Sequence, residues 1–318
     1  MKNKFALWAS ISALFVLIFA SEEVISSSRD ALKICADSLL PSLFPFFVVS
    51  ALLSKLGLPH YLQKQLAPIA SKTFSVSGAG ISALFVGLCG GYPMGAAYIT
   101  ELYCDKTISR SEAERLLAFC NNSGPAFIIG VMGVSVFRST KIGIILYSVH
   151  ILSAILTGIS FRRRSFISAT AQQPAQIISF SQALPQAVKQ SVTSCLNVCG
   201  FVVCFTVFTG LLDANGFLSI LSAKLSVLSG YELHWSRAAI TGIFELGSAA
   251  ALMTYLSPLP HNIALAAALL SWGGISVHFQ TMSLISDTDI KGTLHFAGRL
   301  LSAVLSYILA YVFALLFA

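Results

Sequence analysis

The sequence contains few charged residues and none of the motifs that mark common soluble enzymes. Only 10% of its 318 residues are charged, compared with about 25% in a typical soluble domain. A phosphate-binding GxxxxGKS/T loop is absent, as are a Ser/His/Asp arrangement, a metal-protease motif and a soluble region large enough for an ATPase. We therefore expect no enzyme, no bound cofactor and no metal centre.

Paired cysteines are also absent. The seven cysteines form no CxxC motif, and most of them lie inside apolar segments. Cys195 and Cys199 merely share a helical face. Because free cysteine behaves as a small buried hydrophobe, we expect these residues to contribute packing rather than redox or metal chemistry.

Long apolar stretches dominate the chain, which is 56% hydrophobic with a mean hydropathy of +0.80. A helix needs about 20 residues to cross the hydrocarbon core of a bilayer. Six stretches reach that length, and a seventh, 262–286, does so despite a break at Gly273-Gly274. The six are residues 5–22, 36–56, 115–136, 142–161, 194–213 and 294–317. The sequence therefore predicts an all-α polytopic membrane protein.

Three apolar segments are interrupted in their middle by polar or glycine-rich residues. Residues 78–100 contain Gly90-Gly91-Tyr92-Pro93, and residues 237–257 contain Glu245-Leu246-Gly247-Ser248. The span 115–136 contains Asn121-Asn122-Ser123-Gly124-Pro125. Non-helical backbone at membrane depth is tolerated only where protein buries it or a cavity lies beside it. We expect the first two segments to be re-entrant hairpins and the third to be a broken span.

The distribution of basic residues sets the orientation, since cytoplasmic loops carry an excess of Lys and Arg. With a cytoplasmic N-terminus and two hairpins, 13 of the 20 Lys and Arg residues lie inside, six lie outside and Arg299 lies within a span. The net charge of +7 thus reports topology rather than nucleic-acid binding. A cleaved signal peptide is the alternative for residues 5–22, but the later membrane elements favour an uncleaved span.

The order span, hairpin, broken span and span occurs twice along the chain. Each unit crosses the membrane three times, so the second copy must be inverted relative to the first. Inverted repeats around broken helices indicate a binding site near the membrane midplane. The predicted organisation is an N-terminal transmembrane anchor (1–30), a first repeat (31–163), a linker (164–178) and a second repeat (179–318).

The first repeat also contains a familiar set of motifs. They are Gly90-Gly91-Tyr92-Pro93-Met94-Gly95, Glu101-Leu102-Tyr103 and the run from Ser111 to Pro125 that ends in Asn-Asn-Ser-Gly-Pro. Together they resemble the sporulation integral membrane proteins of endospore formers, which contain a nucleoside-recognition (Gate) domain. The resemblance covers roughly residues 30–318, and Phe244–Ser248 fits it only loosely.

That resemblance implies a transport role. The wider Gate group includes concentrative nucleoside transporters, whose two hairpins and two broken helices follow the same order. The closest sporulation branch implies passage of dipicolinic acid, a small aromatic dianion, across a bacterial cell membrane or forespore membrane.

The candidate substrate-binding residues lie at the breaks, because half-helix ends expose free backbone groups to a solute. They are Gly90, Gly91, Tyr92, Gly95, Asn121, Asn122, Ser123, Gly273, Gly274 and Ser276. Close helix packing is the alternative role for the glycines, and hydrogen bonding between helices is the alternative for the two asparagines.

Two ionisable residues are candidates for coupling-ion binding or gating. Glu245 is an acid inside an apolar hairpin, and such a residue is by default a functional hypothesis. A salt bridge to Arg299 or Arg237 is its alternative role. His278 follows the break in span 262–286, where Gln280 could face the same cavity, and packing is its alternative role, as it is for His150.

The main functional hypothesis is a permease for a small organic anion that works by alternating access at a midplane site. A nucleoside carrier with the same architecture is one alternative, and a sporulation membrane scaffold that transports nothing is another. The expected partners are a small-molecule anion and membrane lipid, with no nucleic acid. A homo-oligomer is left open.

Overall fold

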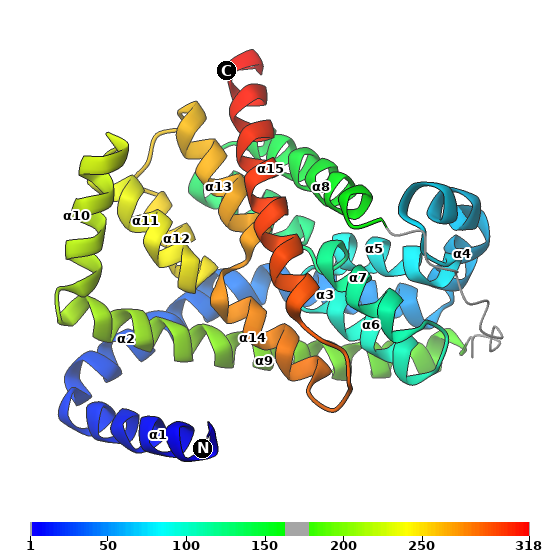
Figure 1. Ribbon diagram of the computed structural model, residues 1–318, viewed down its shortest axis with the longest axis horizontal. Helices are drawn as coiled ribbons and strands as arrows, with labels where there is room; N and C mark the ends of the chain where they lie inside the picture. The colour runs from blue at the N-terminus through cyan, green and yellow to red at the C-terminus, as the bar shows by residue number, and fades with distance from the viewer. Residues whose placement is uncertain (1, 163–177, 318) are drawn as a thin grey trace.

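The computed structural model describes residues 2–162 and 178–317, and its regular elements are all helices (Figure 1). Most of the linker 164–178 lies outside the described residues. The helices of the first part are α1 (Lys2–Phe19), α2 (Ser21–Ile34), η1 (Cys35–Leu39), α3 (Leu40–Lys55), α4 (Leu58–Ile69), η2 (Ala70–Phe74), α5 (Gly78–Gly90), α6 (Met94–Cys104), α7 (Arg110–Phe119), η3 (Ala126–Val136) and α8 (Thr140–Ser160). Those of the second part are α9 (Phe180–Ala214), α10 (Phe217–Ser229), α11 (Leu233–Phe244), α12 (Leu246–Met253), α13 (Pro260–Trp272), α14 (Gly274–Ile285) and α15 (Thr293–Phe317).

The described helices confirm a polytopic membrane protein. Five of them are long and apolar enough to cross a bilayer, or six if the bent pair 58–74 and 78–90 counts as one span. That pair bends by 95°. The bend lies just before the predicted hairpin 78–100, whose own interruption is at residues 91–93, between α5 and α6.

Two predicted span boundaries are wrong. The second span begins at Ser21 rather than at residue 36, and it continues without interruption through η1 to Lys55. The fifth begins at Phe180 rather than at residue 194. In both cases polar residues lower the hydropathy of the first turns, but no glycine lies within those turns to end the helix. Hydropathy therefore marks the apolar part of each helix and misses its polar extension.

All four predicted breaks are present. The first hairpin turns between α5 and α6 at residues 91–93, and the second turns between α11 and α12 at Glu245 alone. Residues 120–125 separate α7 from η3, and Gly273 separates α13 from α14. Gly273 and Gly274 have φ of +84° and +83°, a region that glycine adopts readily and other residues do not.

Side-chain caps fix where the first hairpin and the first broken span begin. Ser77 accepts a hydrogen bond from Gly80 N at the start of α5, and Ser109 accepts one from Glu112 N at the start of α7. Glu112 does not complete a capping box with Ser109. Its carboxylate instead accepts the Ser77 N–H at 2.6 Å, which ties the start of α7 to the start of α5.

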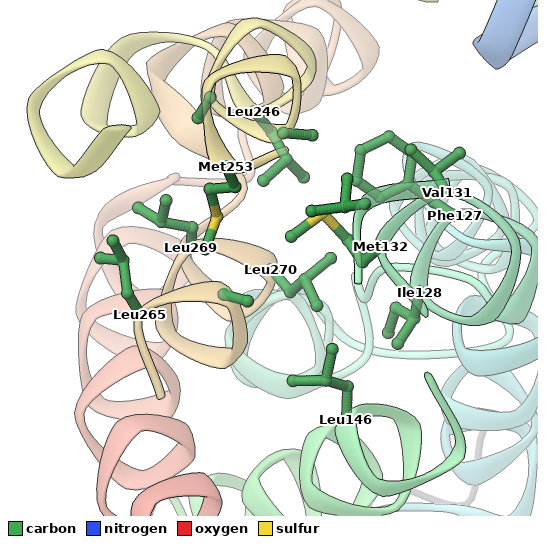
Figure 2. Close-up of a cluster of buried hydrophobic side chains, with 14 of the residues drawn as sticks. Phe127, Ile128, Val131, Met132, Leu146, Leu246, Met253, Leu265, Leu269 and Leu270 are labelled. Carbon is green, nitrogen blue, oxygen red and sulfur yellow. The ribbon is translucent and has the colours of Figure 1, made fainter. Parts of the chain in front are cut away.

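The main hydrophobic core lies between η3, α8, α12 and α13. Figure 2 shows Met132, Leu146, Met253 and Leu270 converging there from these four elements. Helices α13 and α15 pack along each other, and α9 runs beside α2 and α3 across the molecule (Figure 1). Helices from both repeats thus enclose the segment between α7 and η3.

A polar cluster joins the loop before α15 to the first repeat outside the apolar segments. Asp289 accepts hydrogen bonds from the Tyr103 hydroxyl and from Arg110 Nη1. The Tyr103 bond, aided by the Arg110 charge, holds the pKa of Asp289 below its ordinary value. Lys291 N also donates to Glu114 at 3.0 Å.

We expect Gly298→Ala to destabilise the protein. An added Cβ at Gly298, where α15 crosses α7, would lie 2.2 Å from Ala118 O, and overpacking of this kind costs roughly 1–3 kcal/mol. Gly200→Ala on α9 is the matched control, since no heavy atom lies within 4 Å of its added Cβ. Thermal unfolding in detergent should show a lower melting temperature for Gly298→Ala only. Equal melting temperatures for the two variants would contradict the tight crossing.

Candidate functional site

The four breaks meet at backbone contacts in the centre of the bundle. A Cβ added to Gly91, at the tip of the first hairpin, would lie 2.8 Å from Gly124 N in the first broken span. A Cβ added to Gly274, in the second broken span, would lie 3.0 Å from the carbonyl oxygen of Phe244 in the second hairpin. Each hairpin tip therefore packs directly on the break of its own repeat.

A contact between the repeats completes the arrangement. A Cβ added to Gly273, in the second broken span, would lie 3.3 Å from Tyr92 Cζ in the first hairpin. The Tyr92 hydroxyl also donates toward the carbonyl oxygens of Leu270 and Ser271, at 3.4 Å each. Tyr92 thus joins the hairpin of one repeat to the broken span of the other.

A cavity lies among these breaks. Its volume is about 60 Å³, room for about two water molecules at roughly 30 Å³ each. Its lining residues come from both repeats and from η1, α3 and α9: Leu39, Leu43, Gly91, Tyr92, Ser123, Gly124, Phe127, Val198, Val202, Glu245, Leu246, Gly247, Val277 and Gln280. The wall is mostly apolar, and its polar side chains are Tyr92, Ser123 and Glu245 at the breaks and Gln280 on α14.

Glu245 is the only charged residue in that lining. Its side chain is 3% exposed, and its two carboxylate oxygens accept hydrogen bonds from the backbone N–H groups of Gly247 (at 2.8 Å) and Ser248. A carboxylate in this position interacts favourably with the positive end of the half-helix α12.

The predicted salt bridge of Glu245 does not form among the described residues. Arg237 pairs with Asp213. Arg299 donates to Tyr92 OH, Asn122 Oδ1 and Ala118 O, at 3.3, 3.1 and 2.9 Å. The Glu245 carboxylate is therefore held by the start of its own helix, through the backbone of Gly247 and Ser248 and the Ser248 side chain, and it lines the cavity.

Asn121 and Asn122 are both fully buried and do not line the cavity. Asn121 donates to Thr281 Oγ1 at 2.8 Å and accepts from Ala96 N at 3.3 Å. Asn122 donates to Phe119 O at 2.8 Å and accepts from Arg299. The two amides thus bond to neighbouring helices and position the break.

Ser123 does line the cavity, and a hydrogen-bonded chain holds its backbone. Its N–H donates to His150 Nε2 at 3.1 Å, which leaves the ring proton on Nδ1 for Ser271 Oγ at 2.9 Å. Ser271 Oγ lies 2.6 Å from Ser306 Oγ, which donates to Ser153 Oγ at 2.7 Å. His150, which packing alone could explain from the sequence, therefore connects the broken spans of the two repeats.

The remaining predicted site residues lie behind the cavity wall. The glycines at positions 90 and 95 are packing sites, because a Cβ added to Gly95 would lie 2.3 Å from Cys120 O, and one added to Gly90 would lie 3.0 Å from Met94 Cβ. Ser276 accepts from Gln280 Nε2 at 3.4 Å.

His278 is fully buried among the rings of Trp272, His295 and Phe296, and neither of its nitrogens has a hydrogen-bond partner. It packs beside the break rather than in the cavity lining. Among the described residues, no three His, Cys, Asp or Glu side chains are grouped to hold a metal ion.

The structure brings two more residues to the centre, one of which, Gln280, is already expected near the cavity from the sequence. Gln280 lines the cavity, one helical turn after Ser276, and its Oε1 has no hydrogen-bond partner. Arg299 is fully buried and contacts the first hairpin and the first break. The expectation from the sequence that Gln280 could face the cavity is confirmed. For Arg299, the only signal was a lone cation inside an apolar run.

Comparisons with known proteins agree on the architecture. No family model matches the chain. The sporulation integral membrane protein YlbJ of Bacillus subtilis (strain 168) is 31% identical over 304 residues, covering 87% of this chain and 74% of that protein.

Two solved structures of CNTnw have the same fold as this chain. A variant in an outward-facing state has a TM-score of 0.62 at 14% identity, covering 99% of this chain and 86% of that chain. CNTnw in an inward-facing substrate-bound state has a TM-score of 0.58 at 14% identity, covering 99% and 84%. At this identity the likeness shows a shared fold.

We expect Gly91→Ala to be far more disruptive than Gly216→Ala. Both glycines have positive φ, +77° and +72°. Gly216 is in the left-handed helical region, where another residue costs roughly 1–2 kcal/mol, whereas Gly91, with ψ of −177°, lies in a region that essentially only glycine adopts. Only Gly91 adds a collision, with Gly124 N, while no atom lies within 4 Å of a Cβ at Gly216. Thermal unfolding of the two purified variants should show the larger loss for Gly91→Ala. The same small loss in both would mean that the hairpin tip does not need its close contact.

Proposed function

We propose that this chain, which belongs to the family of the sporulation integral membrane protein YlbJ, is a permease that carries a small organic anion through the centre of its helix bundle. The observation that carries this proposal is the interior cavity at the meeting point of the four breaks. Non-helical backbone in a membrane protein is costly unless it lines such a cavity, and it supplies polar groups to a solute there.

The shared fold supports movement as well as binding. CNTnw has been solved in outward-facing and in inward-facing substrate-bound states, so this arrangement of helices opens to either side in that protein. The cavity of the present chain holds only about 60 Å³, less than an aromatic dicarboxylate or a nucleoside needs. A transport cycle therefore requires the hairpins to move away from the breaks.

The location of the polar residues favours a permease over a scaffold. A scaffold would display its unusual polar residues on an outer surface for partners. Here Gly91, Tyr92, Ser123 and Glu245 instead line an interior cavity. In this proposal the midplane site belongs to both repeats, 31–163 and 179–318.

A small organic anion, for which dipicolinic acid is the leading candidate, is favoured by the resemblance to the sporulation branch and by the buried cation Arg299 next to the cavity wall. A nucleoside is the second candidate. It is favoured by the acceptor atoms of Glu245 and Gln280 in the lining, which suit the hydroxyl and amine groups of a nucleoside. The proposed location is a bacterial membrane, including one around a developing spore, with a cytoplasmic N-terminus.

Blocking the cavity should abolish transport. Val202 lines the cavity and is 3% exposed, so an indole in the variant Val202→Trp would fill the space between hairpins and breaks. Val304→Trp is the control, since Val304 is 50% exposed on α15. Uptake of radiolabelled dipicolinate and uridine into proteoliposomes should fall at least tenfold in Val202→Trp and stay unchanged in Val304→Trp. Uptake that survives Val202→Trp would place the solute path elsewhere.

A panel of solutes should identify the substrate class. A ligand that binds the folded state raises the melting temperature in proportion to the logarithm of its concentration above the Kd. We expect pyridine and benzene dicarboxylates to stabilise the purified protein more than nucleosides do. Stabilisation by nucleosides alone would identify a nucleoside, rather than an anion, as the substrate. If neither class stabilises the protein and no uptake is measured, the permease proposal fails and the non-transporting scaffold is favoured.

A further inference from the structure

One face of α15 carries polar side chains at positions that should be apolar in a buried membrane helix. His295, Arg299, Ser302 and Ser306 follow one another at intervals of four, three and four residues, and all are 0% exposed. Three of them are neutral or easily neutralised. Arg299 is different, because a guanidinium stays charged in any protein environment, and burying an unpaired charge is strongly unfavourable.

The partners of Arg299 are all neutral and all belong to the first repeat. Its three hydrogen bonds go to Ala118 O, Asn122 Oδ1 and Tyr92 OH, and Nε has no partner. No carboxylate lies within ion-pair distance among the described residues. The carbonyl at Ala118 belongs to the last turn of the half-helix α7, whose negative end partly offsets the charge.

The position of this cation matters because of Tyr92. Tyr92 lines the cavity, and its hydroxyl lies 3.3 Å from Arg299 Nη1, so one side chain separates the guanidinium from a bound solute. Other donors could satisfy the three acceptors without a charge. A charge adds something a neutral donor does not, which is a positive potential in a site of low dielectric constant.

Glu245, on the cavity wall, carries the negative charge that opposes the positive charge of Arg299. Its carboxylate already accepts two backbone N–H groups at the start of α12, so its charge is partly compensated there, as that of Arg299 is at the end of α7. The site therefore contains one fixed cation behind Tyr92 and one carboxylate held by its own helix end.

We propose that Arg299 is the specificity-determining residue of the cavity and makes it prefer a small aromatic dicarboxylate over an uncharged solute of the same shape. This inference rests on the proposed permease function and adds the residue that selects the charge of its solute. Arg299 acts through the field it creates and through Tyr92, without touching the solute.

Two ligands and three variants test the proposal. Pyridine-2,6-dicarboxylate and pyridine-2,6-dicarboxamide have nearly the same shape and differ by two charges, so the ratio of their Kd values reports charge selectivity. Arg299→Gln removes the charge and keeps a donor, whereas Arg299→Lys keeps the charge. Asn122→Asp keeps Arg299 and places a carboxylate at the atom that lies 3.1 Å from its guanidinium.

We expect the wild-type protein to favour the dicarboxylate. Arg299→Gln and Asn122→Asp should each reduce that preference about tenfold, the order expected when one unit charge acts through a protein interior. Arg299→Lys should keep the preference within about threefold of wild type. Asn122→Asp decides the matter if Arg299→Gln fails to fold, because it preserves shape and leaves the buried cation paired.

The outcomes separate the two proposals. A wild-type preference that survives both Arg299→Gln and Asn122→Asp, or a wild-type protein that does not distinguish the ligands, overturns the role of Arg299 and leaves the permease proposal intact. If the purified wild-type protein binds neither ligand and transports no dicarboxylate, the proposal that it carries a small organic anion is wrong. The proposed role of Arg299 is then wrong as well.

Discussion

Direct contact between backbone segments at the centre of the bundle is the constraint on which the rest of this structure depends. The first hairpin reaches its broken span only because Gly91 and Gly124 have no side chains to separate them, and Gly274 gives the second broken span the same access to the second hairpin. Because these glycines have no side chains, polar backbone is uncovered at membrane depth. That backbone must be bonded by neighbouring groups or must face a cavity, and both solutions are present around Ser123.

The residues at the breaks find hydrogen-bond partners in the opposite repeat as well as in their own. Asn121 bonds Thr281, Arg299 bonds Asn122 and Tyr92, and His150 connects Ser123 to Ser271. The centre of the molecule is therefore a single polar network built by both repeats. A movement of the first hairpin therefore changes the bonds that Tyr92 makes with Leu270, Ser271 and Arg299 of the second repeat.

The breaks were predictable from local sequence because each depends on residues that disfavour a membrane helix. Gly90-Gly91-Tyr92-Pro93, Asn121–Pro125 and Gly273-Gly274 have this property independently of their neighbours, and Glu245 is conspicuous as an acid in an apolar segment. The polar beginnings of α2 and α9 were missed because the hydropathy is low at residues that are nevertheless helical.

The sequence by itself determined that the chain is a polytopic helical membrane protein with two hairpins and two broken spans in a repeated order, since composition, apolar length and helix-breaking residues are local properties. Only the tertiary structure decided which residues line the cavity. Helix rotation and crossing turned Gln280 toward it, turned Asn121, Asn122 and His278 away, and placed Arg299 against Tyr92. These relations join residues more than a hundred positions apart, and their geometry is set by how whole helices pack, which no local pattern contains.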